Sequence, residues 1–189
     1  MKNCNIAILG ATGAVGVVFS LMALIQAVGF FFGHGSGNFI SRELGKKNVR
    51  GAEEMAATGF FSSFIAGLFI LLAGMLFLHP LARLLGSTDT ILPYAVEYLR
   101  IILIGAPYMC ASLVLNNQLR FQSNAFFAMI GLTTGGILNL ALDPLLIFGF
   151  DMGVTGAALA TILSQLVSFI LLFIGIQRSD SLKIHFRNY

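Results

Sequence analysis

Five long apolar stretches, separated by short polar segments, constrain the fold of this 189-residue chain more than any other feature. A helix that crosses a bilayer needs about 20 mostly apolar residues, and each of these stretches is long enough. Only helices and closed barrels satisfy their backbone hydrogen bonds inside lipid, so the sequence predicts an all-α membrane protein with five transmembrane helices. The expected helices span about residues 5–44, 56–78, 95–117, 125–148 and 154–176.

The composition argues against several other classes of protein. Hydrophobic residues make up 57% of the chain and charged residues 10%, whereas a soluble domain carries roughly 25% charged residues. The net charge of +3 is dispersed among the apolar stretches, which disfavours a nucleic-acid partner because such proteins need a concentrated basic face. The two cysteines and three histidines show no spacing typical of a metal site. We therefore expect a lipid bilayer to surround the chain.

The basic residues between the predicted helices indicate an orientation. Segments 41–54 and 119–124 and the C-terminus together carry eight Lys and Arg residues, and the other side carries three. Because basic residues are enriched in cytoplasmic loops, we expect these two segments and the C-terminus to be cytoplasmic in a multi-pass protein of the cell (inner or plasma) membrane. The N-terminus would then lie outside, which suggests that another helix precedes the first one seen here.

One carboxylate interrupts the fourth apolar stretch, in ILNLALDPLLIFGF (137–150). Asp143 is the only acidic residue well inside such a stretch, and Asn139 lies four residues before it. Residues four apart share one face of a helix, so the two side chains lie one turn from each other. Pro144 cannot donate a backbone hydrogen bond and clashes with the carbonyl of Leu140, which predicts a kink and a free carbonyl beside the carboxylate.

These groups predict a binding site for a small cation or a proton. Carboxylate, amide and carbonyl oxygens are hard ligands that suit small cations, and a carboxylate removed from water readily takes up a proton. If the following turn centres near Asp151, Asp143 and Thr161 both lie roughly 12–15 Å from that surface at about 1.5 Å per residue. Thr161 is therefore expected to face Asn139 and Asp143. Alternatively, a neutral Asp143 only hydrogen-bonds Asn139 and holds two helices together.

Three segments resemble one known family of membrane proteins. GHGSGNFISRELGKKN (33–48), YLRIILIGAP (98–107) and above all ILNLALDPLLIFGFDMGVTGAALATILSQ (137–165) look like the multidrug and toxic compound extrusion family, MATE. Members have twelve helices in two six-helix lobes, and this chain is similar to helices two to six of the N-terminal lobe. The resemblance implies secondary active efflux of amphiphilic, cationic small-molecule drugs by antiport of H+ or Na+, with no enzymatic activity and no cofactor besides the coupling ion.

The resemblance also implies roles for particular residues. Family members with the motif N-x3-D-P in the fifth helix bind the cation through this Asn and Asp and through a Thr of the sixth helix. These positions correspond to Asn139, Asp143 and Thr161, the trio expected from spacing. The family site also uses an Asp of the first helix. That helix and the C-terminal lobe are missing from this sequence and are its expected partners.

Three other functions remain open. A flippase for lipid-linked glycans of the same superfamily often needs basic residues in its cavity, and only Arg83 and Arg100 approach the predicted helices. An intramembrane aspartyl protease needs two opposed carboxylates, and only Asp143 is available. A non-transporting membrane fragment is the third alternative, because five helices without the other lobe form only part of a transporter.

Overall fold

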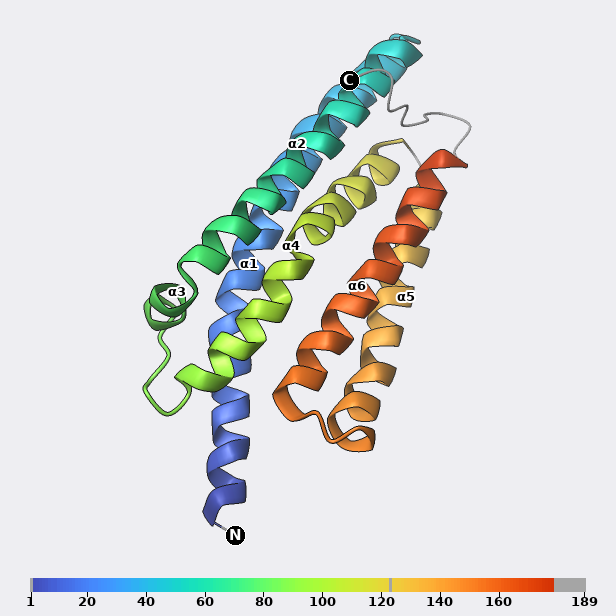
Figure 1. Cartoon of the computed structure of the whole chain (residues 1–189). Helices are drawn as coiled ribbons and strands as arrows, with labels where there is room; N and C mark the ends of the chain where they lie inside the picture. Colours follow the sequence, from blue (N-terminus) through green and yellow to red (C-terminus); the bar gives the residue numbers. More distant parts are fainter. Residues whose placement is uncertain (1, 123, 179–189) are drawn as a thin grey trace.

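The chain folds into long antiparallel helices (Figure 1). The computed structural model describes residues 2–122 and 124–178, with side chains from Gly16 onward. In chain order the elements are α1 (Lys2–Gly45), α2 (Val49–Leu76), α3 (Leu78–Leu84), α4 (Leu92–Phe121), α5 (Ala125–Pro144), the π-helical η1 (Leu145–Gly149) and α6 (Gly153–Gln177). Five segments are long and apolar enough to cross a membrane, at 16–45, 49–76, 92–121, 125–149 and 153–177. The predicted all-α fold class with five membrane-length helices is confirmed.

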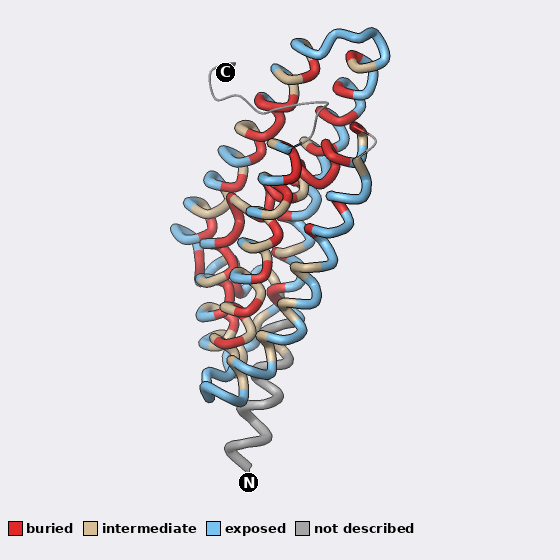
Figure 2. The backbone as a smooth tube through the Cα atoms, turned by 90° about the vertical axis from the view of Figure 1, so that its right-hand side faces the viewer, coloured by how far each residue is buried: buried red, intermediate tan, exposed pale blue. Residues whose placement is uncertain are grey.

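Helix α4 is the centre of the bundle. In its most apolar window 72% of the residues are buried, against 17% to 33% in the other four long helices. It packs on α1, α2 and α6, and less extensively on α5. Figure 2 shows the buried residues on the inward faces of the helices and the exposed residues outside. The outward faces carry large apolar side chains such as Phe19, Phe31 and Leu140, as expected for helices surrounded by lipid.

Close approach of α2 to α4 depends on Gly67. A Cβ atom added at Gly67 would lie 2.6 Å from Cα of Pro107 and 2.9 Å from the carbonyl oxygen of Ala106. Both are backbone atoms of α4, so no side-chain movement could relieve the contact. Small residues allow such backbone contact in membranes, where van der Waals packing rather than the hydrophobic effect drives helix association.

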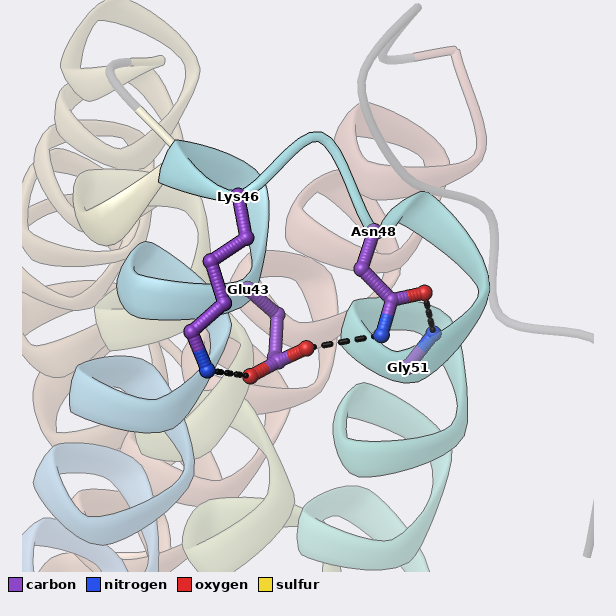
Figure 3. A network of polar contacts seen from close by, with 4 residues as sticks. All are labelled: Glu43, Lys46, Asn48 and Gly51. Atoms are coloured by element: carbon purple, nitrogen blue, oxygen red, sulfur yellow. Dashed lines mark hydrogen bonds and ion pairs between the residues drawn. The ribbon is translucent and has the colours of Figure 1, made fainter.

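A polar network fixes the turn between α1 and α2 (Figure 3). The carboxylate of Glu43 accepts a hydrogen bond from Nζ of Lys46 at 2.8 Å and another from Nδ2 of Asn48 at 2.7 Å. Oδ1 of Asn48 accepts from the backbone N–H of Gly51 at 3.2 Å and thereby caps the first turn of α2. Such a cap satisfies a donor that the helix itself leaves unpaired.

Several helix boundaries differ from the predicted ones; the third long helix, for example, spans Leu92–Phe121 rather than about 95–117. The second long helix begins at Val49 rather than near residue 56, because the Asn48 cap supports a polar first turn that an apolar-length criterion does not detect. It ends at Leu76, and the short helix α3 begins almost at once. Pro80 is the third residue of α3, a position where the missing N–H costs no intrahelical hydrogen bond.

The connections between the helices lie at two opposite ends of the bundle. The α1–α2 turn, the α4–α5 connection and the end of α6 lie at one end of the bundle, and α3 and the α5–α6 turn lie at the other (Figure 1). Segments 41–54 and 119–124 therefore share one end, as the alternation of the helices predicted. The C-terminal residues 179–189 are outside the described residues. Assignment of this end to the cytoplasm stays a prediction.

Candidate functional site

Asp143 lies at the end of α5, where the helical hydrogen-bond pattern changes. Regular α-helix ends at Pro144, and the π-helical segment η1 follows directly. The change falls where the sequence predicted a kink, and its cause is the missing N–H of the proline. Short π-helical segments are often found at functional sites.

Helices α5 and α6 pack closely along their length, which brings α6 beside this position. Oγ of Ser168 donates a hydrogen bond to the backbone oxygen of Gly131 at 2.8 Å. A Cβ atom at Gly135 would lie 3.0 Å from Cβ of Ser168, and one at Gly156 would lie 2.9 Å from the backbone carbonyl of Leu146. Small residues of α6 therefore meet α5 at Ser168 and η1 at Gly156.

Tyr98 of α4 lies near Thr161 and Asp143. Its side chain is buried, with 5% of its surface exposed; it is close to the side chain of Thr161 and within electrostatic range of Asp143. The hydroxyl of Thr161 donates to the backbone oxygen of Ala157 at 3.0 Å. Asp143, Thr161 and Tyr98 thus lie in one region of the bundle, on three different helices.

Two hydrogen bonds hold α4 against α6 on either side of Tyr98. Oγ1 of Thr155 donates to Oε1 of Glu97 at 2.6 Å, and the hydroxyl of Tyr108 donates to the backbone oxygen of Ile162 at 2.9 Å. These two bonds hold α4 to α6 over the stretch that contains Tyr98 and Thr161.

Among the described residues, no hydrogen bond or ion pair joins the side chain of Asn139 or Asp143 to another side chain. Both residues are half-buried, and Nδ2 of Asn139 is buried without a hydrogen-bond partner in the described part of the chain. Ion pairs among the described residues join Lys46 to Glu43, Arg50 to Glu54 and Arg83 to Asp89, and none of them includes Asp143. A buried donor without a partner is rare in native proteins. As an N–H group it requires an acceptor such as water, whereas a cation would be bound by Oδ1 of Asn139.

The site therefore offers carboxylate, amide and hydroxyl groups inside membrane-length helices, without a protein cation among the described residues to balance the charge. The three predicted residues lie on the paired helices α5 and α6. Tyr98 was missed by the sequence analysis, because nothing in the α4 sequence shows which of its faces meets α6. The tyrosine does lie in segment 98–107, one of the three that carried the resemblance.

Four membrane-length helices around a fifth, α4, with a carboxylate inside one of them, define a polytopic membrane protein with an intramembrane polar site. The family model described as MatE matches residues 10–145. The chain belongs to this family, as its sequence motifs predicted.

Several known proteins are similar to the chain. "Multidrug export protein MepA" of Staphylococcus aureus (strain MRSA252) is 30% identical over 177 residues, covering 92% of this chain and 39% of MepA. The protein of the same name from Staphylococcus saprophyticus is 31% identical over 170 residues, covering 88% of this chain and 37% of that protein. The chain thus spans about two fifths of the length of these relatives.

Solved structures show the same fold. The inward-facing conformation of a multidrug resistance MATE family transporter of the MOP superfamily superposes with a TM-score of 0.90 at 30% identity, covering 95% of this chain and 41% of that one. A MOP superfamily transporter from Pyrococcus furiosus gives a TM-score of 0.86 at 30% identity, covering 99% and 43%. That structure is described as having a binding pocket of reverse polarity, which suggests a different function for it.

Proposed function

We propose that the chain forms part of a secondary active multidrug exporter, in which H+ or Na+ moves against amphiphilic, cationic drugs. Family membership and the similarity to proteins named for multidrug export support this proposal. Because the chain spans about two fifths of those relatives, transport would require the helices that correspond to the rest of their length. The chain would act as a transporter component and not as an enzyme.

One observation carries the proposal: Asp143 lies inside a membrane-length helix, and no ion pair among the described residues includes it. A charged Asp costs about 2.5–3.5 kcal/mol by insertion scales at the centre of a membrane helix, and a part of that at Asp143, which lies toward the end of the segment 125–149. Binding a proton or Na+ removes most of that cost, so the cation favours a conformation in which the site is closed. The amide of Asn139 and the hydroxyl of Thr161 would supply further oxygen ligands.

Coupling follows if the drug and the cation prefer different conformations. A ligand shifts a conformational equilibrium only by its difference in affinity between the two states, and the effect is reciprocal. Asp143 lies next to η1, where the hydrogen-bond pattern has already departed from α-helix. We propose that neutralising Asp143 changes the bend of α5 at this point and thereby reshapes a drug cavity.

The test is Asp143→Asn in the transporter that contains this chain, measured as cation-driven drug efflux from cells or proteoliposomes. We expect coupled efflux to be abolished while membrane insertion is retained, because Asn keeps the shape but cannot exchange a proton or balance Na+. Asp151→Asn is the matched control: Asp151 is exposed in the α5–α6 turn with φ of 53°, and Asn tolerates that conformation. Efflux near the parent rate in Asp143→Asn would refute the proposal.

Single substitutions of Asn139 and Thr161 compare the contribution of each residue to coupling with that of Asp143. Asn139→Ala and Thr161→Ala should each weaken coupling less than Asp143→Asn, because each removes one neutral ligand. If both variants transport like the parent, the trio serves only helix packing. Repeating the assay with a proton gradient alone and a Na+ gradient alone identifies the coupling ion.

A flippase for lipid-linked glycans is the second candidate. The Pyrococcus furiosus relative, with its described reverse polarity and suggested different function, is the observation that favours keeping it. Translocation of a lipid-linked glycan, together with no drug efflux, would select this alternative. If neither a drug nor a lipid-linked glycan is moved, the result would instead indicate a non-transporting membrane protein.

A further inference from the structure

An aromatic groove separates α2 from α6. Both helices pack on α4. Phenylalanine side chains of α2 and α6 line the space between these two helices. The ring of Phe60 on α2 stacks on Phe169 of α6 with centroids 6.3 Å apart, and lies 6.0 Å from Phe173. A space of about 300 Å³ remains, and it is lined by Phe60, Phe61, Phe64, Phe169 and Phe173.

The groove offers no polar group to an occupant. Its lining side chains are all phenylalanine. The nearest tyrosine, Tyr108, has its ring 6.4 Å from Phe169, but its hydroxyl is bonded to the backbone oxygen of Ile162. Phe64 at the rim is 38% exposed, so the groove opens to the surroundings of the bundle. Both lining helices are of membrane-crossing length, so the groove lies at the depth of the acyl chains of a bilayer.

The end of the bundle above the groove is basic. The α1–α2 turn and the ends of α4 and α6 carry six described Lys and Arg residues against three Glu: Arg42, Lys46, Lys47, Arg50, Arg120 and Arg178 against Glu43, Glu53 and Glu54. Arg50 begins α2 and Arg178 directly follows α6. Each helix that lines the groove thus carries an arginine at this end.

Arg50 stands on the same face of α2 as the rim of the groove. Phe61 and Phe64 follow it by 11 and 14 residues, about three and four helical turns, and so lie within about 40° of it around the helix. The separation along the axis is roughly 16–21 Å at about 1.5 Å per residue. One leaflet of the hydrocarbon core is about 15 Å thick, so a lipid whose phosphate meets Arg50 has its acyl chain at the depth of these rings.

We propose that the groove between α2 and α6 binds an acyl chain of an anionic phospholipid, with the headgroup held at Arg50 and Arg178. Arg50 is paired with Glu54, but the arginine side chain is 89% exposed. Its guanidinium therefore keeps N–H donors that can bind a phosphate. Anionic lipids attract basic residues at the membrane surface, whereas the rings bind the chain through packing alone. This lipid site is independent of drug export and of Asp143.

The absence of tryptophan from the sequence provides a selective test. Phe64→Trp places the sole tryptophan in the groove, and Phe31→Trp places it on the open face of α1, where Phe31 is 76% exposed. Each residue lies roughly 21–23 Å from the basic end of its helix, so the two reporters match in depth. The full chain carrying either reporter is reconstituted in phosphatidylcholine, and lipid with brominated chains is titrated in as phosphatidylglycerol or phosphatidylcholine.

The quantity compared is the mole fraction of brominated phosphatidylglycerol at which quenching is half-maximal. For the groove tryptophan (Phe64→Trp) we expect this mole fraction to be at least fivefold lower than for the open-face tryptophan (Phe31→Trp). Arg50→Gln in the Phe64→Trp background should reduce this preference by about fivefold, since one basic residue near an anionic surface contributes roughly that factor. Arg83→Gln is the control, because Arg83 lies at the other end and is paired with Asp89 at 3.2 Å. That variant should leave the preference unchanged.

Two results would overturn the proposal. Identical quenching curves for both reporters and both lipids would mean that the groove exchanges lipid like any other surface. Strong quenching at Phe31→Trp with none at Phe64→Trp would mean that protein, such as another helix or a second copy of the chain, covers the groove.

Discussion

The close approach of α2 to α4 predicts that Gly67→Ala destabilises the bundle. Alanine adds a single methyl group, and its Cβ would lie 2.6 Å from Cα of Pro107 and 2.9 Å from the backbone oxygen of Ala106. Neither atom belongs to a side chain that can rotate away. The two helices must therefore move apart, which also loosens the contacts of their neighbours.

A matched substitution isolates the size of this effect. Gly→Ala favours a helix by roughly 1 kcal/mol through propensity alone, and overpacking costs about 1–3 kcal/mol. A Cβ at Gly35 of α1 would have no heavy atom within 4 Å, so Gly35→Ala carries only the propensity gain. The free energies of unfolding of the two variants should consequently differ by about 1–3 kcal/mol, with Gly67→Ala the less stable.

Labelling of Cys110 measures this difference. The thiol of Cys110 is fully buried on α4, one turn from Pro107, and Cys4→Ser leaves it as the only thiol in the chain. If labelling follows opening of the bundle, its rate in Gly67→Ala should exceed that in Gly35→Ala by about 5- to 150-fold, since 1.4 kcal/mol corresponds to tenfold. Equal rates in the two variants would refute the packing argument and the α2–α4 crossing on which it rests.

Three further substitutions test other contacts. Tyr98→Phe removes a hydroxyl from a buried side chain close to Thr161 and should weaken cation affinity by about fivefold, measured as the cation dependence of efflux; unchanged affinity would exclude Tyr98 from the site. Ser168→Ala removes the donor to the oxygen of Gly131 and should lower the free energy of unfolding by about 0.6 kcal/mol, with no change expected if the bond is absent. Glu43→Ala removes the acceptor that joins the ends of α1 and α2 and should accelerate hydrogen exchange in that turn, whereas exchange at parental rates would show that the network does not fix it.

The sequence predicted the number of long helices because a membrane imposes a length and an apolar composition on each of them. The same criterion could not locate the start of α2 at Val49, since the Asn48 cap and the polar first turn are stabilised by local hydrogen bonds and not by lipid. It also gave no sign of α3, because Pro80 normally indicates a helix end and here occupies the first turn of a new helix.

The candidate site was inferred for a similar reason, and its role stays a prediction. Asn139 and Asp143 are four residues apart on one helix, and the short turn near Asp151 requires α5 and α6 to be neighbours, which is why Thr161 was expected to face them. Tyr98 belongs to α4, whose rotation about its own axis is set by packing against several helices at once. Periodicity in one helix cannot reveal that rotation. Only the three-dimensional structure therefore shows that Tyr98 lies near Thr161.

The most direct test of the proposed cation site is the release of H+ or Na+ when a cationic drug binds to the purified transporter that contains this chain. We expect about one cation to be released for each drug bound by the parent protein. In Asp143→Asn we expect drug binding without cation release, because the displaced charge was held at that carboxylate. Equal release from the parent and from Asp143→Asn would contradict the account and place the coupling ion elsewhere.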